Sequence, residues 1–341
     1  DQEGIVQGNL QGESFDYPLT IKIDSVKTPN PYARFLVEGE STVESLEKRF
    51  KLQQISYLKG LLAIKAELRF SRNPKTADSI IFRSDLEGLT VNLPVPLGKT
   101  AHESVPSTLT LDLNPDTNLR LKADYNGRIS ADMLFKTSKN LMGLESGQIR
   151  LGSALAVNQN TSGLVVTGAL DGFNLQDWKN WFMSLPQDQK SFALKDKLTL
   201  IDVTLNKLTV LKQSFDQFSI KAKLMKSQDW SFALSQKKVS ADLTYHHSSN
   251  QLAGYVRYLH LDPISLNKTL LSSTSINPSQ IPNLNLRVDN FTVGKIQVGN
   301  IILKSTSSAN KWLINYGRIE TPDYQFNVNG EWIQQGKNNQ T

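Results

Sequence analysis

Apolar and polar residues alternate along most of this chain of 341 residues, and the alternation limits the folds that it can adopt. In one stretch, Leu119, Leu121 and Ala123 are separated by Arg120 and Lys122. Successive side chains of a strand point to opposite faces of a sheet, so each such stretch predicts a strand with one apolar and one polar face. About 18 such strands follow one another at intervals of roughly 8–12 residues, the pattern of an all-β protein.

Two stretches break the alternation and predict short helices. Ser41–Glu44 fits a capping box, which opens a helix that ends near Arg49. Asn174 is the expected N-cap of a second helix, with Asp177 in its first turn and Pro186 at its end. A sheet with a few helical insertions is therefore the expected architecture.

Outside the strands and these two helices, the sequence predicts a weaker third helix, a loop and a proline-rich segment. A third, weaker helix is expected at Ile264–Leu271, followed by a loop over Ser272–Pro282. Two prolines, Pro94 and Pro96, cannot donate to a strand ladder, so we expect an extended crossing segment there and a turn at Gly98. No linker of flexible composition divides the chain, so residues 1–336 are predicted to form one continuous β segment and residues 337–341 a frayed tail.

Composition argues against several classes of protein. The chain has no cysteine, which removes disulfides and thiolate chemistry, and no apolar run approaches the ~18 residues of a membrane-spanning helix. The net charge of +6 is spread along the sequence, whereas nucleic-acid-binding proteins concentrate basic residues on one face. The chain begins with Asp1 and has neither a signal peptide nor an initiator Met, so we expect a processed form or a fragment of a longer protein.

Residues that carry catalysis or bind metals are few and scattered. His246 and His247 are adjacent in a predicted strand and point to opposite faces, so they cannot both bind one metal ion. The sequence has no Gly-rich phosphate loop, nucleophile elbow or metalloprotease helix. We therefore expect no enzymatic activity, no metal and no cofactor.

The apolar face of such a sheet has to be covered or used. The sheet can close into a barrel, fold into a sandwich, or curl around a groove. Small residues such as Ala66, Ala123 and Gly168 among the apolar positions leave room inside a curved sheet, but they also occur in filled cores. A transmembrane barrel is disfavoured because too few strands reach the ~9–11 residues of a spanning strand.

Three sets of motifs, in order along the chain, resemble the YhdP branch of the AsmA-like family. They are Ser-Asp-Leu at 84–86 with Leu-Pro-x-Pro-Leu-Gly-Lys at 93–99, Leu-Asp-Gly-x-x-Leu-x-x-Trp at 170–178, and Ile-Pro-Asn-Leu at 281–284 with Gly-Glu-Trp at 330–332. Together they cover most of the sequence. The family's amino-terminal membrane helix and far carboxy-terminal part have no counterpart here, so the chain is similar to an internal or late segment.

The resemblance implies a mainly β fold: an elongated, twisted antiparallel sheet curled into a U-shaped hydrophobic groove, with one or two short helices. It also implies a segment of a periplasmic bridge, anchored to the inner membrane in the full-length protein, that carries phospholipids between the inner and outer membranes. Other envelope proteins are candidate partners. The alternative is a non-transporting β-rich envelope scaffold or interaction protein with a filled core.

If the groove is open, lipid acyl chains should lie on the apolar faces of the strands. The residues predicted to line the groove are Leu111, Leu121, Ile129, Met133, Leu164, Val166, Ile220, Leu224, Leu243, Phe326 and Val328. The helix that follows Asn174 is a candidate lid or membrane-facing element through Leu175, Trp178, Trp181 and Phe182, because Trp favours interfaces. The simpler interpretation, which the apolar stripe of this helix favours, is that it caps the end of the sheet.

Overall fold

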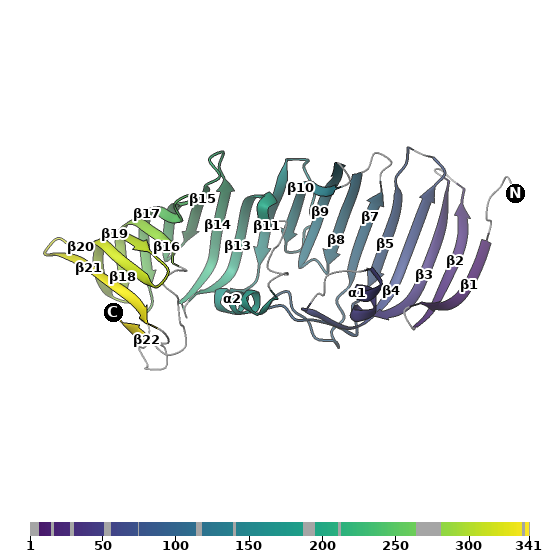
Figure 1. Cartoon of the computed structure of the whole chain (residues 1–341), viewed down its shortest axis with the longest axis horizontal. Coiled ribbons are helices and arrows are strands. Elements are labelled where there is room, and N and C mark those ends of the chain that lie inside the picture. Colours follow the sequence, from purple (N-terminus) through teal and green to yellow (C-terminus); the bar gives the residue numbers. More distant parts are fainter. Residues whose placement is uncertain are drawn as a thin grey trace. The chain divides into compact units, whose positions relative to one another are not determined.

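The computed structural model describes residues 7–14, 17–27, 31–50, 56–73, 75–113, 118–138, 141–186, 195–210, 213–263, 281–335 and 338–340. The chain forms two compact units, Asp1–Thr199 and Leu200–Thr341, and both are built mainly from β-strands (Figure 1). The mainly β fold predicted from the alternation is thereby confirmed. Whether the two units act as one continuous segment stays a prediction.

The first unit is a sheet of consecutive strands with helices at the strand ends. Its elements are β1 (Gln7–Ser14), β2 (Tyr17–Val26), β3 (Tyr32–Thr42), α1 (Val43–Phe50), β4 (Leu58–Ser71), β5 (Asp78–Ser84), β6 (Leu89–Val91), β7 (Ser107–Leu113), β8 (Asn118–Tyr125), β9 (Ile129–Ser138), β10 (Leu141–Leu151), β11 (Gly163–Leu170), β12 (Phe173–Asn174), α2 (Leu175–Ser184) and the 3₁₀ turn η1 (Lys195–Lys197). Strands β1 to β5 and β7 to β11 pair in chain order, and β6 pairs with the start of β4.

The second unit repeats this plan with longer strands. Its elements are β13 (Leu198–Val210), β14 (Gln213–Leu224), β15 (Trp230–Gln236), β16 (Val239–His246), β17 (Gln251–Leu261), β18 (Asn283–Val293), β19 (Ile296–Ser307), β20 (Lys311–Glu320), β21 (Gln325–Gln335) and β22 (Asn338–Gln340). Each strand pairs with the next in the chain. The short strand β22 lies where the sequence predicted a frayed tail.

Two neighbouring pairs of strands are parallel, which the prediction of an antiparallel sheet did not include. They are β10 with β11 and β17 with β18. Parallel neighbours need a connection that returns along the length of the strands. Residues 152–162 make this return between β10 and β11, and we call residues 152–161 the strap. The connection between β17 and β18 includes residues 264–280, so the predicted third helix and most of the predicted loop lie outside the described residues.

Local capping explains where both helices begin. The Oγ1 atom of Thr42 accepts a hydrogen bond from the backbone N–H of Ser45 at 3.2 Å, so α1 starts one residue later than a cap at Ser41 would place it. Strand β3 continues up to this cap, since both Ser41 and Thr42 pair with β4. The N-cap predicted for α2 is confirmed, because the side chain of Asn174 accepts from the N–H of Gln176 at 3.0 Å.

The proline segment differs from the extended crossing that the sequence predicted. Pro94 to Leu97 form a tight turn, in which the N–H groups of Leu97 and Gly98 both donate to the carbonyl of Pro94. Val91 and Lys99 then pair through two backbone hydrogen bonds of 3.0 Å. The prolines end the strand ladder as expected, but the chain reverses at once because this short bridge closes the loop.

Candidate functional site

The strand register of the first unit lines up apolar side chains in rows across one face of its sheet. One row, from β2 to β11, consists of Ile23, Phe35, Leu68, Ile80, Leu111, Leu121, Met133, Gly147 and Leu164. The next row contains Val37, Ala66, Phe82, Leu109, Ala123, Ala131, Ile149 and Val166. We call the face that carries these rows the apolar face of the first unit.

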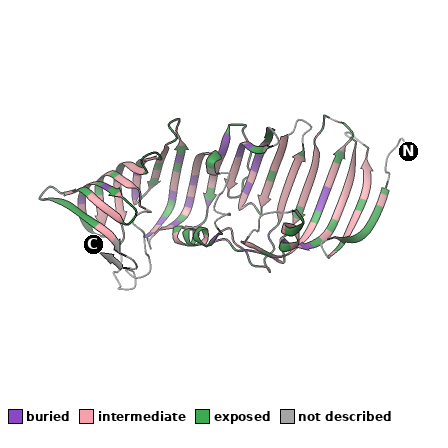
Figure 2. Ribbon diagram, in the orientation of Figure 1, coloured by how far each residue is buried: buried purple, intermediate pink, exposed green. Residues whose placement is uncertain are grey.

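Most of this apolar face is only half-buried. From Ile23 on β2 to Leu121 on β8, every member of the first row keeps part of its surface exposed, and Figure 2 shows the same for most strand residues of this unit. Met133 and Leu164 are buried, and the exposed fraction of Leu164 is 3%. These two pack with Leu144 in a small cluster on β9 to β11. The face therefore changes from open to covered along the row.

The second unit carries a corresponding apolar face. One row crosses it through Val203, Ile220, Leu234, Ala241, Val256, Val288, Ile301, Ile319 and Phe326. Val203, Ala241, Val256 and Val288 are buried, whereas Phe326 is exposed by 56%. The buried members of this row thus lie between β13 and β18, and its exposed end lies at β21.

The register brings the predicted groove residues together within each unit. Leu111, Leu121, Ile129, Met133, Leu164 and Val166 share the apolar face of the first unit. Ile220, Leu224, Leu243, Phe326 and Val328 share that of the second. The degree of burial differs among them, which the alternation does not indicate. That they contact a lipid stays a prediction.

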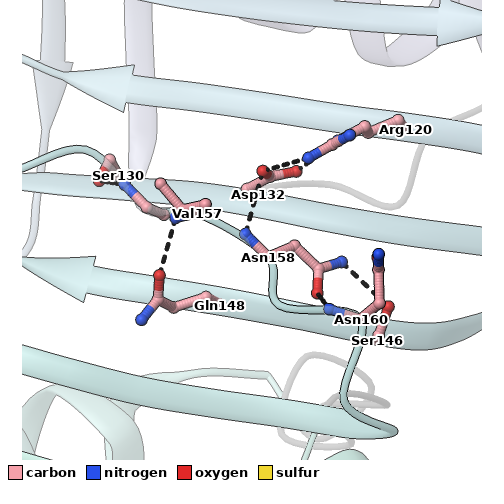
Figure 3. Close-up of polar contacts among 9 residues, drawn as sticks. Arg120, Ser130, Asp132, Ser146, Gln148, Val157, Asn158 and Asn160 are labelled. Atoms are coloured by element: carbon pink, nitrogen blue, oxygen red, sulfur yellow. Dashed lines mark hydrogen bonds and ion pairs between the residues drawn. The ribbon is translucent and has the colours of Figure 1, made fainter.

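On the opposite, polar face of the first unit, the strap crosses β9 and β10 (Figure 3). The carboxylate of Asp132 accepts two hydrogen bonds from Arg120, at 2.8 and 2.7 Å, and a third from the backbone N–H of Asn158 at 3.1 Å. The amide of Asn158 donates to the hydroxyl of Ser146 at 2.9 Å. Two residues earlier in the strap, the N–H of Ala156 donates to Ser130 Oγ at 2.8 Å. The strap is thus fixed to the sheet by polar contacts.

Asp132 is the central charge of this contact, and its exposed fraction is 3%. Burial alone would raise the pKa of its carboxyl group. The hydrogen bonds from Arg120 and from the N–H of Asn158, together with the nearby positive charge, outweigh burial and hold the pKa below its usual value. Asp132 is therefore ionised at neutral pH, and the strap is attached to an ion pair whose carboxylate is buried.

Helix α2 separates its four predicted residues into two pairs. Trp178 stacks on Phe173 with ring centroids 5.6 Å apart, and Trp181 meets the ring of Tyr57 at 5.9 Å. Leu175 and Phe182 are exposed, as is the neighbouring Met183. Trp181 therefore faces the protein and not the solvent. The tryptophans attach α2, and the smaller apolar side chains point away from it.

A compact apolar cluster closes one end of the apolar face at β4. Val43 of α1 is buried with Leu89 and Val91 of β6, and these pack against Leu58 and Leu62. The loop that follows β6 is fastened by Lys99, the last residue of the motif at 93–99, to which the sequence assigned no structural role. Its buried ammonium group donates to the carbonyls of Leu86 at 2.7 Å, Thr100 at 2.8 Å and Leu89. Burial lowers the pKa of Lys99.

The described residues contain little else that points to a reaction. Neither α1 nor α2 is long and apolar enough to cross a membrane. Over the same residues, no group of three or more His, Asp or Glu side chains is arranged to hold a metal ion. His246 and His260 have local partners, with Nδ1 3.0 Å from Asp229 Oδ2 and 2.6 Å from Thr292 Oγ1, respectively.

Comparison with known proteins agrees with the family resemblance of the sequence motifs. The family model described as YhdP protein matches residues 1–341. No curated protein and no solved structure matches the chain.

Proposed function

Because the chain belongs to the YhdP family, we propose that it binds phospholipid acyl chains on the apolar faces of its two units and forms part of a path between the inner and outer membranes. The observation that carries this proposal is the row of half-buried apolar residues from Ile23 to Leu121. A sheet that had to be stable without a ligand would gain by covering these side chains, since burial of apolar surface is the main favourable term in folding.

The chemistry of the rows suits a moving lipid. Each methylene of an acyl chain that leaves water for an apolar surface contributes ~0.8 kcal/mol. Neighbouring positions such as Leu111, Leu121 and Ile80 present similar aliphatic surface, and they come from strands that lie side by side. An acyl chain can therefore shift by one strand without losing much contact. A row of this kind favours passage over tight binding at one point.

The opposite face suits an aqueous compartment. Its ion pairs, such as Asp24 with Arg34 and Asp132 with Arg120, belong to a surface that meets water or the strap. Membership of this family supports a place in the periplasm, with the full-length protein anchored to the inner membrane and other envelope proteins as partners. Lipid headgroups would stay in water at the edge of the apolar face while the acyl chains lie on it.

Helix α2 has a separate part in this proposal. Leu175, Phe182 and Met183 expose apolar surface while Trp178 and Trp181 attach the helix to the unit. A helix held in this way can lie against lipid as a lid or meet a membrane surface, since apolar side chains on one face drive interfacial binding.

Mass spectrometry of the protein purified gently from a bacterial host tests the proposal. We expect phospholipid to co-purify and to be removed by detergent washing. An unrelated periplasmic protein taken through the same purification gives the background. Protein that carries no phospholipid above this background would contradict the proposal and favour the alternative of an envelope scaffold.

A further inference from the structure

A cavity of about 880 Å³ lies at one end of strands β8 to β11 in the first unit. Its walls come from the 94–98 turn, the β8–β9 hairpin, the end of β10 with the start of the strap, and the end of β11. This volume is within the range of ligand sites. Four charged side chains line it: Arg128, Arg150, Glu103 and Asp171.

Within the described residues, neither arginine of the cavity forms an ion pair with a carboxylate, although the charge of Arg128 acts on nearby Glu103 and helps to lower its pKa. Arg34 and Arg120 each form two hydrogen bonds with an aspartate. In the described part of the chain, by contrast, Arg150 Nε is buried with no hydrogen-bond partner. Arg128 donates a long hydrogen bond of 3.4 Å to the carbonyl of Pro96 and lies over the Tyr125 ring.

A guanidinium group with unused donors is a strong site for a phosphate group. Arginine presents its N–H groups in a planar fork that matches phosphate oxygens, and such charge-assisted hydrogen bonds are stronger than neutral ones. Leaving a buried donor unsatisfied costs free energy, which an anionic ligand at Arg150 would recover. The lining therefore favours a ligand that carries a phosphate.

The carboxylates narrow the choice of ligand. Glu103 lies in the same cavity wall and already accepts hydrogen bonds from the N–H and hydroxyl of Thr100 through Oε2. Together with Asp171 it would repel a second phosphate but attract an ammonium group. A zwitterion that carries both a phosphate and an amine matches this lining better than a simple anion.

The cavity adjoins the apolar face. Leu151 and Gly168, which both line the cavity, pair with each other, and Leu151 pairs with Ile129 on its other side. This is the last row of the apolar face at that end of the strands. Gly168 fixes the close approach, since a Cβ atom there would lie 2.0 Å from the carbonyl oxygen of Leu151. Arg150 pairs with Ser130 and therefore points to the polar face, whereas Leu151 and Ile129 belong to the apolar face, so the cavity lies at the strand ends where the two faces meet. A headgroup bound there can place its acyl chains around this edge on Ile129 and the rows beside it.

We infer that this cavity binds the phosphate–ammonium headgroup of a phospholipid whose acyl chains lie on the adjoining apolar face. The lipid source of the headgroup rests on the proposed function. A soluble phosphate ester with an amine has the same chemistry, so the experiment has to separate the two sources.

Isothermal titration calorimetry with three probes makes this separation. The probes are dihexanoyl phosphatidylethanolamine below its micelle concentration, glycerophosphoethanolamine and inorganic phosphate. The variants are R128Q and R150Q, with R83Q as the matched control, because Arg83 is an exposed arginine outside this cavity. We expect the short-chain lipid to bind most tightly, and R128Q and R150Q each to raise its Kd about tenfold, the equivalent of one charge-assisted hydrogen bond. R83Q should bind like the parent.

Equal affinity of the parent, R128Q and R150Q for the short-chain lipid would overturn the inference about the cavity. If phospholipid still co-purified with these variants, the proposed function would stand although the headgroup site was wrong. Equal affinity of the parent for glycerophosphoethanolamine and the lipid would overturn the lipid source. Inorganic phosphate that binds as tightly as either ester would overturn the zwitterionic ligand. Thermal melting checks each variant, and R128Q alone decides the result if R150Q does not fold.

Discussion

The two faces of the first unit's sheet differ in which residues are buried: polar residues on one face are more deeply buried than apolar residues on the other. On the polar face, Ser130, Asp132 and Ser146 are almost completely buried, because the strap covers them. On the apolar face, Leu111 and Leu121 on the neighbouring strands are only half-buried. The usual order, with apolar residues inside and charged residues outside, is reversed over this part of the sheet.

Because of this reversal, the polar face contributes to the stability of the fold and the apolar face is the one proposed to bind a ligand. The polar face can be covered by the strap because nearly every buried polar group there finds a partner, which keeps the cost of burial low. The apolar face keeps its surface available, and the free energy that its burial would release remains for a ligand. The sheet thus buries polar groups on one face, while many apolar side chains of the other face remain half-buried. The predictions below test this division, beginning with the largest effect.

Leu164→Asp should unfold the first unit or destabilise it by at least about 3 kcal/mol. Leu164 is buried beside Met133, and a carboxylate there would have neither water nor a partner. Val165→Asp is the matched control, because Val165 is the next residue, is half-buried and points to the polar face. Urea denaturation followed by circular dichroism measures both. Equal stability of the two variants would contradict the burial assigned to this row.

Asp132→Ala should cost about 2–3 kcal/mol of unfolding free energy, since removal of one partner of a buried ion pair leaves the other uncompensated. This loss is smaller than that expected for a fully buried ion pair, because Arg120 is partly exposed to solvent. Asp24→Ala removes a more exposed aspartate from a similar pair with Arg34 and should cost less than about 1 kcal/mol. Similar losses in the two variants would show that the strap adds nothing to the contact.

Acid should weaken the polar face through the same carboxylate. The pKa of Asp132 is lower in the folded protein than in the unfolded chain, where it is about 3.9. Its contribution is therefore complete above the unfolded pKa and is lost as the pH falls through the folded pKa. Asp24 and Glu67 also have lowered pKa values, so the parent is compared with Asp132→Asn, which should lose less stability between pH 5 and pH 2. If the unfolding free energies of the parent and Asp132→Asn fell by the same amount between pH 5 and pH 2, this account would be contradicted.

The alternation predicted the strands and their faces well because it is a local property. Leu121, Met133 and Leu164 were assigned to one face from their own neighbours alone, and the register places them in one row. The N-cap at Asn174 was equally local. Local signals were not always sufficient, because the turn at Pro94 to Leu97 was predicted as an extended segment.

The strap could not be predicted because its contacts are distant in the sequence. Asn158 reaches Asp132 across 26 positions, and within its own segment it looks like an ordinary loop residue. Asp132 likewise alternates with apolar residues as an exposed aspartate would. Asp132 and Asn158 are buried because the parallel pairing of β10 with β11 brings the strap back across the sheet. The alternation of apolar and polar residues does not show whether neighbouring strands are parallel or antiparallel, so it could not predict this pairing.

Leu121→Asp should leave the fold intact and lower the amount of bound lipid. Leu121 lies half-buried between Leu111 and Met133, so water can still reach a carboxylate there and the loss of stability should stay below about 1.5 kcal/mol. Melting temperature and lipid content by mass spectrometry are compared with the parent. Loss of folding would show that this part of the face is a filled core. Normal lipid content would show that Leu121 does not contact the ligand.

The central claim is that lipid lies on the apolar face and not on the polar face. The chain has no cysteine, so a single fluorophore can be attached at Leu121→Cys or at Lys122→Cys, adjacent positions on opposite faces of β8. Phospholipid with a spin label on its acyl chain is then added, and quenching is measured at each site. We predict strong quenching at position 121 and little at position 122. Equal quenching at both positions, or none at position 121, would contradict the account.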